Sequence, residues 1–230
     1  EDVTNDQSNA STAIRRAWQR ALRSLERWDF DLGGPLLDGR DIRIVDCGDV
    51  PGDPYKPMKH YDLAEAAARK IIESGAMIIS LGGDHGVPIP VFRALSSLPD
   101  LSGPITLVHV DAHLDWRDHV NGVHEGLSSP IRRASEMDHF GEIYQIGLRS
   151  AGSARPDEME AARKYGSNLI PDIELQDFVI EDTSDKKERL SKLTLPLKET
   201  NFIFSPIISL IDLNNEGVQK NKFFLAHFGK

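Results

Sequence analysis

Two short segments hold the residue types that can bind a metal ion or move a proton. In the first, SLGGDHG, a glycine pair lets the backbone turn tightly after an apolar run and places His85 behind the turn. The second follows the apolar run 105–110 and places Asp111, His113 and Asp115 at two-residue steps. In an extended chain alternate side chains point to the same side, so these three groups are expected to converge.

A divalent metal ion is the chemistry that these groups favour. Two carboxylates and an imidazole crowded at one strand end repel each other and lose hydration unless a cation neutralises them. Carboxylate and imidazole ligands without cysteine suit a borderline-hard ion such as Mn²⁺, with zinc, iron, cobalt and nickel as alternatives, and they argue against a structural thiolate zinc site.

One site can use both segments. In open parallel sheets ligands collect beyond the carboxyl ends of neighbouring strands, so His85 is expected to face Asp111 across adjacent strands. The predicted ligands are His85, Asp111, His113 and Asp115. His109 is left out of this set, because a histidine inside a strand is more often held by hydrogen bonds than by a metal.

The elements that must position these residues alternate along the chain. Helical spacing of apolar residues predicts helices over residues 11–28, 63–74, 88–97, 129–136 and 157–165. Runs of Ile, Val and Leu predict strands over residues 42–47, 76–81, 105–110 and 142–148, with a short one near 169. Asp62 with Glu65 is expected to cap the second helix and Gly75 to end it. The pattern predicts a three-layer αβα fold with a mostly parallel sheet covered on both faces.

Composition excludes several classes of protein. The 230 residues carry a formal net charge of −9 and no basic run, which disfavours nucleic acid as a partner. No apolar stretch approaches the roughly 20 residues that cross a bilayer, so no membrane contact is expected. The single Cys47 cannot form an internal disulfide, and no signal peptide is visible, so a reducing, cytoplasmic compartment is the expectation.

The composition changes near residue 178. Before it the chain has 15 Arg and 4 Lys, whereas the rest has 1 Arg, 7 Lys and two of the 18 Gly. We therefore expect an α/β domain at residues 1–178 and a divergent, Lys-rich tail at 179–230. The apolar segment 202–213 of the tail is expected to add a strand or to pack on the body. The tail is either a peripheral segment or sequence of foreign origin, such as a frame change, and the nucleotide sequence after codon 177 distinguishes the two.

These residues resemble the ureohydrolase family, which includes arginase and agmatinase. The sequence GGDH that ends at His85 is similar to the family's first metal motif. The run from Asp111 to Asp118 is similar to the second, Asp-Ala-His-x-Asp-x-x-Asp, and 146–150 resembles the family's next strand. The similarity extends over residues 11–177 and is closer to the agmatinase-like branch than to arginase.

The resemblance implies a ligand set and a reaction. By it, His85 and Asp115 hold one Mn²⁺, His113 holds a second, and Asp111 bridges the two. The ions lower the pKa of a bridging water that attacks a guanidinium carbon and releases urea and an amine. The leaving amine needs a nearby acid, and His124 is the candidate, although the family often has His-Gly-Thr/Ser-Pro where this chain has HEGLSSP.

The same resemblance implies a small guanidino substrate such as agmatine and a homo-oligomer, because the family usually forms trimers or hexamers. The family's third motif, Ser-x-Asp-x-Asp-x-x-Asp-Pro, and its later guanidinium-binding Glu are absent from the sequence; the nearest match, at residues 209–214, has one carboxylate, Asp212. We therefore expect a fold that is incomplete at the C-terminal end. The alternative function is an inactive or truncated ureohydrolase-fold protein with an incomplete metal site. A nucleotide-binding module is disfavoured, since no glycine-rich phosphate loop follows any strand.

Overall fold

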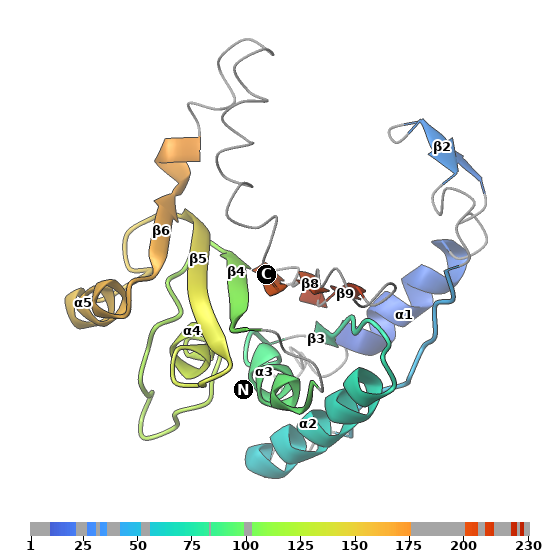
Figure 1. The fold of residues 1–230 in the computed structure, drawn as a ribbon, viewed down its shortest axis with the longest axis horizontal. Coiled ribbons are helices and arrows are strands. Elements are labelled where there is room, and N and C mark those ends of the chain that lie inside the picture. The colour runs from blue at the N-terminus through green and yellow to red at the C-terminus, as the bar shows by residue number, and fades with distance from the viewer. Residues whose placement is uncertain are drawn as a thin grey trace, which may run out of the picture.

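The computed structural model describes residues 10–21, 27–30, 33–35, 42–51, 56–82, 84–98, 103–175, 201–206, 210–213, 222–224 and 226–227. Its main sheet has six strands in the order β6-β5-β4-β7-β8-β9 (Figure 1). The bounds of these strands are β4 Ile105–Val110, β5 Phe140–Leu148, β6 Asn168–Pro171, β7 Asn201–Pro206, β8 Leu210–Leu213 and β9 Lys222–Phe224. Strand β4 pairs in parallel with β5 and β7, β5 pairs in parallel with β6, and only β8 and β9 add antiparallel pairings.

Helices accompany the parallel strands. Their bounds are α1 Ala10–Ala21, α2 Pro57–Glu73, α3 Pro88–Ala94 with a 3₁₀ turn at Leu95–Ser97, α4 Pro130–Ala134 and α5 Pro156–Tyr165. Helices α3 and α4 lie side by side in Figure 1. Proline at the first turn suits each of α2 to α5, because that position has no intrahelical N–H bond to lose. The predicted α/β fold with a mostly parallel sheet is confirmed.

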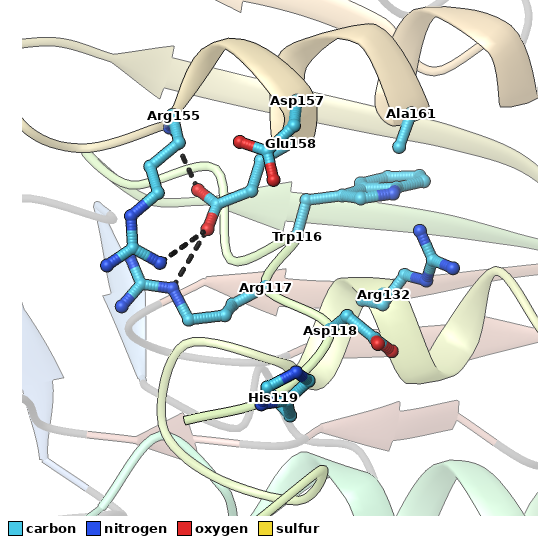
Figure 2. Close-up of a pocket in the computed structure, with 9 residues that line it drawn as sticks. All are labelled: Trp116, Arg117, Asp118, His119, Arg132, Arg155, Asp157, Glu158 and Ala161. Atoms are coloured by element: carbon cyan, nitrogen blue, oxygen red, sulfur yellow. Dashed lines mark hydrogen bonds and ion pairs between the residues drawn. The ribbon is translucent and has the colours of Figure 1, made fainter. Parts of the chain in front are cut away.

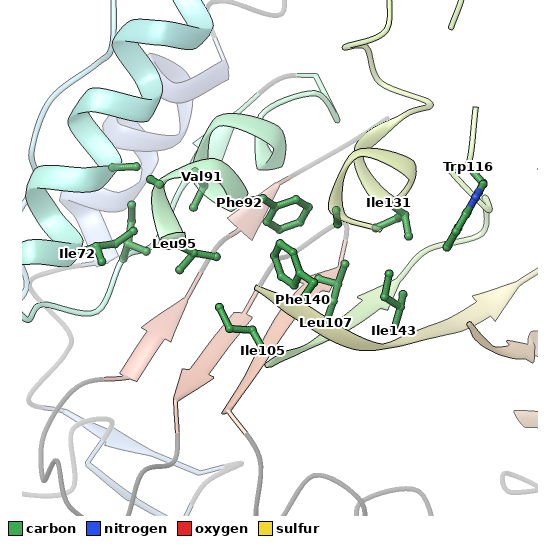
Figure 3. Packing of buried hydrophobic residues seen from close by; sticks show 14 of the residues in the cluster. Ile72, Val91, Phe92, Leu95, Ile105, Leu107, Trp116, Ile131, Phe140 and Ile143 are labelled. Atoms are coloured by element: carbon green, nitrogen blue, oxygen red, sulfur yellow. The ribbon is translucent and has the colours of Figure 1, made fainter. Parts of the chain in front are cut away.

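The core lies between β4, β5 and the helices α3 and α4. Five of the six residues of β4 are buried, as a strand covered by neighbours on both sides requires. Phe92 of α3 packs edge-on against Phe140 of β5 with ring centroids 5.3 Å apart, next to Leu107 and Ile143 (Figure 3). This packing fixes the carboxyl end of β4, beside which the candidate metal ligands lie.

Most of the elements near the site match the prediction. The strands over 105–110 and 142–148 and the helices over 88–97 and 157–165 are present within a few residues of their predicted ends. The helix predicted at 129–136 is shorter, and the segment predicted to pack or add a strand at 202–213 holds β7 and β8. Gly75 ends α2 with φ 75°, a left-handed backbone that glycine adopts without strain.

Other expectations are wrong at the N-terminal side. Helix α2 begins at Pro57, so Asp62 and Glu65 do not cap it. Residues 76–80 form no strand, and the two-residue β3, Leu81–Gly82, pairs with β10, Ala226–His227, outside the main sheet. Trp28, predicted as the end of the first helix, lies in β1, Trp28–Asp29, which pairs with β2, Gly34–Pro35.

The segment 42–47 is not the buried strand that its apolar residues predict. Ile44 and Val45 are 47% and 59% exposed, and no described strand pairs with the segment. Arg15 of α1 holds it instead, with Nε 2.6 Å from Asp46 Oδ2 and Nη1 2.8 Å from Asp49 Oδ2. The division of the chain at residue 178 stays a prediction. Within the described ranges, none of the helices has both the length and the apolar character to cross a bilayer.

Candidate metal centre

Four side chains gather at the carboxyl end of β4. His109 lies within β4, Asp111 follows its last residue, and Asp115 lies four residues further along the loop. His85 comes from the turn between β3 and α3. One donor atom from each of the four lies within 4.8 Å of the others, which is the spacing of a metal-binding cluster.

The distances inside the cluster are close to those between neighbouring ligands of one metal ion. His85 Nδ1 lies 2.7 Å from Asp115 Oδ2 and 3.4 Å from Asp111 Oδ2. His109 Nε2 lies 3.7 Å from the same two oxygens. With metal–ligand bonds of about 2.1 Å, adjacent ligand atoms lie about 3.0–3.4 Å apart, so small adjustments would accommodate an ion.

Backbone hydrogen bonds hold the loop that carries the carboxylates. Asp111 N–H donates to Ile146 O at 3.0 Å, and Leu114 N–H donates to Ser153 O at 3.3 Å. Asp115 O accepts from Arg132 N–H at 3.2 Å, and the φ of Asp115 is 51°, an uncommon backbone conformation for a residue other than glycine. The surrounding chain therefore holds Asp115 in an orientation that a free loop would rarely adopt.

The turn before α3 orients His85. Asp84 Oδ1 accepts a hydrogen bond from Gly86 N–H at 2.5 Å, and Asp84 O accepts one from Val87 N–H at 3.3 Å. An aspartate that accepts from the backbone two residues on forms a compact turn. Asp84 therefore shapes the turn behind His85.

The cluster is buried and charged. The side chains of Asp111 and Asp115 are 3% and 6% exposed, that of His85 is 11% exposed and that of His109 is fully buried. Burial lowers the pKa of His85, but the carboxylates of Asp115 and Asp111 outweigh it, and the net shift is upward. Burial raises the pKa of Asp111, but the neighbouring histidines and the His113 N–H bring it well below its ordinary value.

Asp111 faces two sides. Its Oδ2 points into the four-residue cluster, whereas its Oδ1 accepts a hydrogen bond from His113 N–H at 2.9 Å and lies 3.0 Å from His113 Nδ1. The His113 side chain is 62% exposed and is not one of the four clustered groups. The expected alternation does not extend to His113, because the extended backbone of β4 ends at Val110.

His124 lies on the exposed loop after the second motif. Its side chain is 52% exposed, its Nδ1 lies 3.1 Å from Asp118 O, and its ring centroid lies 5.3 Å from that of His119. The described contacts of His124 are local to this loop, so its predicted catalytic role stays a prediction.

His109 is the residue that the sequence argument left out. It faces the same side as Asp111, which lies two positions further along and directly after the end of β4. The two-residue spacing of Asp111, His113 and Asp115 therefore begins at His109, and that signal was available in the sequence.

The prediction that His85 faces Asp111 across adjacent strands is wrong. Strand β3 pairs with β10, and the neighbours of β4 are β5 and β7, so the two residues do not sit on adjacent strands of one sheet. The turn before α3 brings His85 to Asp111 instead, because α3 packs against the core next to β4. The ligand roles of His85, Asp111, His113 and Asp115 stay predictions.

A shallow pocket of about 210 Å³ lies beside the same loop (Figure 2). Arg117 and Glu158 line it, and Arg117 Nε donates to Glu158 Oε1 at 2.8 Å. Trp116 also lines it but is only 2% exposed and packs against Tyr165. Trp116 and Arg117 follow Asp115 directly, so this wall of the pocket, formed by Trp116, Arg117 and Glu158, ties the candidate ligands to helix α5.

The residues of the cluster fit a divalent ion. Two carboxylates buried side by side are costly unless a positive charge compensates them. Among the described residues, Asp115 Oδ2 and His109 Nε2 are buried polar atoms without a hydrogen-bond partner of good geometry. Oxygen and imidazole nitrogen donors without thiolates suit Mn²⁺ or a similar ion. The fold and the cluster together define an α/β protein with a histidine–carboxylate metal site at the end of a central strand.

Comparison with known proteins identifies the family. Residues 3–194 match the Arginase family, and the chain belongs to this family. It is 31% identical over 138 residues to an agmatinase of Bacillus anthracis, a match that covers 59% of this chain and 45% of that protein. It is 32% identical over 131 residues to a guanidinobutyrase of Pseudomonas aeruginosa, covering 56% of this chain and 40% of that one. The matches thus span less than half the length of these relatives.

Solved structures share the fold. A formiminoglutamase of Trypanosoma cruzi with Mn²⁺ has a TM-score of 0.66 and 19% identity, with 85% of this chain and 61% of that chain covered. The proclavaminate amidino hydrolase of Streptomyces clavuligerus has a TM-score of 0.56 and 21% identity, with 69% and 49% covered. The chain is therefore an arginase-family protein with a histidine–aspartate cluster that could hold a metal.

Proposed function

We propose that this chain is a metal-dependent hydrolase of linear amidines, which releases urea from a guanidino compound such as agmatine. The observation that carries the proposal is the convergence of His85, Asp111 and Asp115 at the carboxyl end of β4 in a member of the arginase family. The similarity to an agmatinase and a guanidinobutyrase supports a small guanidino substrate. The cofactor that we propose is Mn²⁺.

The donors divide into two groups around Asp111. We assign His85 and Asp115 as the residues that would hold one ion and His113 as the residue that would hold a second, with Asp111 serving both. The 3.4 Å between His85 Nδ1 and Asp111 Oδ2, and the 3.0 Å between His113 Nδ1 and Asp111 Oδ1, support this division. Bound metal supplies Lewis acidity, which makes a water molecule acidic enough to act as a nucleophile near neutral pH.

We assign to His124 the role of donating a proton to the leaving amine. A neutral amine departs more easily than its anion, so an acid near the scissile bond speeds the reaction. Because His124 Nδ1 lies within hydrogen-bond distance of a carbonyl oxygen, Asp118 O, that nitrogen carries the proton and Nε2 is the atom that exchanges one. The exposure of the ring gives a substrate on the loop side access to it.

The second candidate is a protein that keeps the fold and one weakly held ion without catalysis. The Oδ1 side of Asp111 offers only one further donor among the described residues, that of His113, which is too few for a full coordination shell. The number of ions bound per chain separates the two candidates.

Urea release with added Mn²⁺ tests the proposal. We expect urea from at least one of agmatine, 4-guanidinobutyrate and arginine, and about two Mn²⁺ per chain by elemental analysis. The variant Asp111→Asn is expected to lose both Mn²⁺ and urea release, whereas Asp138→Asn, at an exposed position outside the cluster, keeps them. Absence of urea from all three compounds, with one ion or none per chain, contradicts the proposal and favours the second candidate.

A further inference from the structure

His109 has a chemical environment that differs from that of a metal ligand. It is fully buried, and its ring stacks on that of His85 with centroids 5.4 Å apart. Its cross-strand neighbour on β5 is Gln145, which is also fully buried. The amide of Gln145 therefore reaches the imidazole from the side opposite to the carboxylates.

The orientation of the Gln145 amide follows from its two other contacts. Its nitrogen lies 2.6 Å from Leu114 O, and its oxygen lies 3.1 Å from Ser167 Oγ. A carbonyl oxygen only accepts, so the amide atom beside Leu114 O must be the nitrogen; the reverse orientation would place two acceptors in contact. Ser167 then donates to the amide oxygen.

This orientation determines which nitrogen of His109 carries the proton. The same Gln145 nitrogen lies 3.3 Å from His109 Nδ1, and because an amide nitrogen only donates, its second hydrogen is the one available to Nδ1. Nδ1 is thus an acceptor, and in a neutral imidazole the other nitrogen then carries the hydrogen. The atom that faces Asp111 and Asp115, at 3.7 Å from each, is Nε2.

A histidine that binds a metal through one nitrogen normally donates the hydrogen of its other nitrogen to an acceptor. His109 has the opposite arrangement, since a donor meets its Nδ1. We infer that His109 does not bind the metal: its Nε2–H faces Asp111 and Asp115 at 3.7 Å, without a hydrogen bond to either, and positions these carboxylates by electrostatic attraction, while Gln145 fixes the tautomer. His109 is thus a positioning residue, and Ser167 and Gln145 extend the hydrogen-bond chain to the loop before β6.

The inference rests in part on the proposed function, since it concerns carboxylates that are proposed to hold a metal. The tautomer itself does not depend on a metal. A long-range ¹H–¹⁵N NMR spectrum of the metal-free, histidine-labelled full chain near neutral pH therefore tests it directly. We expect the resonances of His109, identified by their absence from His109→Gln, to show a protonated Nε2 and an unprotonated Nδ1.

Addition of diamagnetic Zn²⁺ to the same sample tests the ligand assignment. We expect a ring nitrogen of His85 to shift on binding, whereas His109 keeps the proton on Nε2. A protonated Nδ1 in the metal-free spectrum, or loss of the Nε2 proton with Zn²⁺, overturns the inference.

Two variants at His109 separate positioning from ligation and from folding. A glutamine amide can donate toward the carboxylates but replaces an imidazole ligand poorly, whereas leucine does neither. We expect His109→Gln to retain Mn²⁺ affinity within about threefold and His109→Leu to lose about 10- to 100-fold, the range that loss of a residue supporting the ligands commonly costs. Circular dichroism of both variants checks that they are folded.

Equal, large losses of Mn²⁺ affinity in the two folded variants contradict a positioning role and favour direct ligation. If His109→Leu fails to fold, the comparison of His109→Gln with the wild-type chain decides: a loss beyond tenfold counts against the inference. A wild-type chain that binds no Mn²⁺ contradicts the proposed function instead, and the metal-free spectrum alone then decides the tautomer.

Discussion

Removal of the Glu158 carboxylate should destabilise the wall that joins the candidate metal loop to α5. The Glu158 side chain is 8% exposed. Its Oε1 accepts from Arg117 Nε at 2.8 Å, and its Oε2 accepts from Arg155 N–H at 2.9 Å, which caps that backbone N–H at the start of α5 (Figure 2). The second ion pair, from Arg155 Nη1 at 3.6 Å, involves an arginine side chain that is 59% exposed and adds little.

The size of the effect follows from these two contacts. Loss of the helix cap costs about 1 kcal/mol, and loss of a charge-assisted hydrogen bond that leaves Arg117 without its partner costs about 1.5–3 kcal/mol. We therefore expect Glu158→Ala to lower the free energy of unfolding by about 2.5–4 kcal/mol, a large share of the 5–15 kcal/mol of a typical domain. Glu158→Gln keeps an acceptor for the cap and should lose about half as much.

Urea-induced unfolding followed by circular dichroism measures these differences. The matched control is Glu136→Ala, because Glu136 also pairs with an arginine, Arg132, but is 43% exposed. Such an exposed pair contributes about 0.3–0.5 kcal/mol. If Glu158→Ala costs no more than Glu136→Ala, the Arg117–Glu158 contact does not stabilise the fold and the reasoning from burial fails.

Two further predictions concern the core and the pH. Phe92 is fully buried against Phe140, so Phe92→Ala should lower the free energy of unfolding by about 3–5 kcal/mol, whereas Phe30→Ala, at a position 91% exposed, should change it by less than about 0.5 kcal/mol in the same urea titration. Burial brings the pKa of His139 below its ordinary 6.5, although the contact of its Nε2 with Phe92 O opposes the shift. A lowered histidine pKa means that the unfolded chain binds the proton more readily, so stability is complete above about pH 6.5 and falls below it; His139→Gln should reduce this loss between about pH 7.5 and pH 5, and equal pH dependence in both proteins would contradict the assignment.

The fold near the site was predictable because its elements have strong local signals. The residues of β4 are almost all Ile, Leu, Val or Thr, and α5 has proline at its first position and Gly166, with φ 93°, just after its end. The segment 42–47 also has four apolar residues, but a strand needs a partner, and pairing is a property of the fold rather than of the segment. The same holds for the strand predicted at residues 76–81, because only its last residue, Leu81, lies in a strand.

The candidate site was predictable in part for the same reason. Alternation along an extended chain places residues two apart on one side, and this holds for His109 and Asp111, of which one is in β4 and the other follows its last residue. It does not hold for His113, because the chain has left the strand there and the ring turns toward solvent. Asp115 returns to the cluster through a left-handed backbone conformation, which the sequence does not reveal for an aspartate.

The two negative charges of the cluster explain the different roles of its histidines. Asp111 and Asp115 bring two negative charges into the protein, and no Lys or Arg among the described residues forms an ion pair with either. The side chains next to these carboxylates are histidines instead. A neutral imidazole offers either one donor or one lone pair on the side that faces a carboxylate. Gln145 makes Nε2 of His109 the protonated nitrogen on that side, whereas the Nδ1 of His85 faces both carboxylates and would release its proton to water when a metal ion takes its place. A divalent cation would then replace one proton with two positive charges while the Nε2–H of His109 continued to attract both carboxylates, which explains why a buried histidine inside β4 is useful without being a ligand.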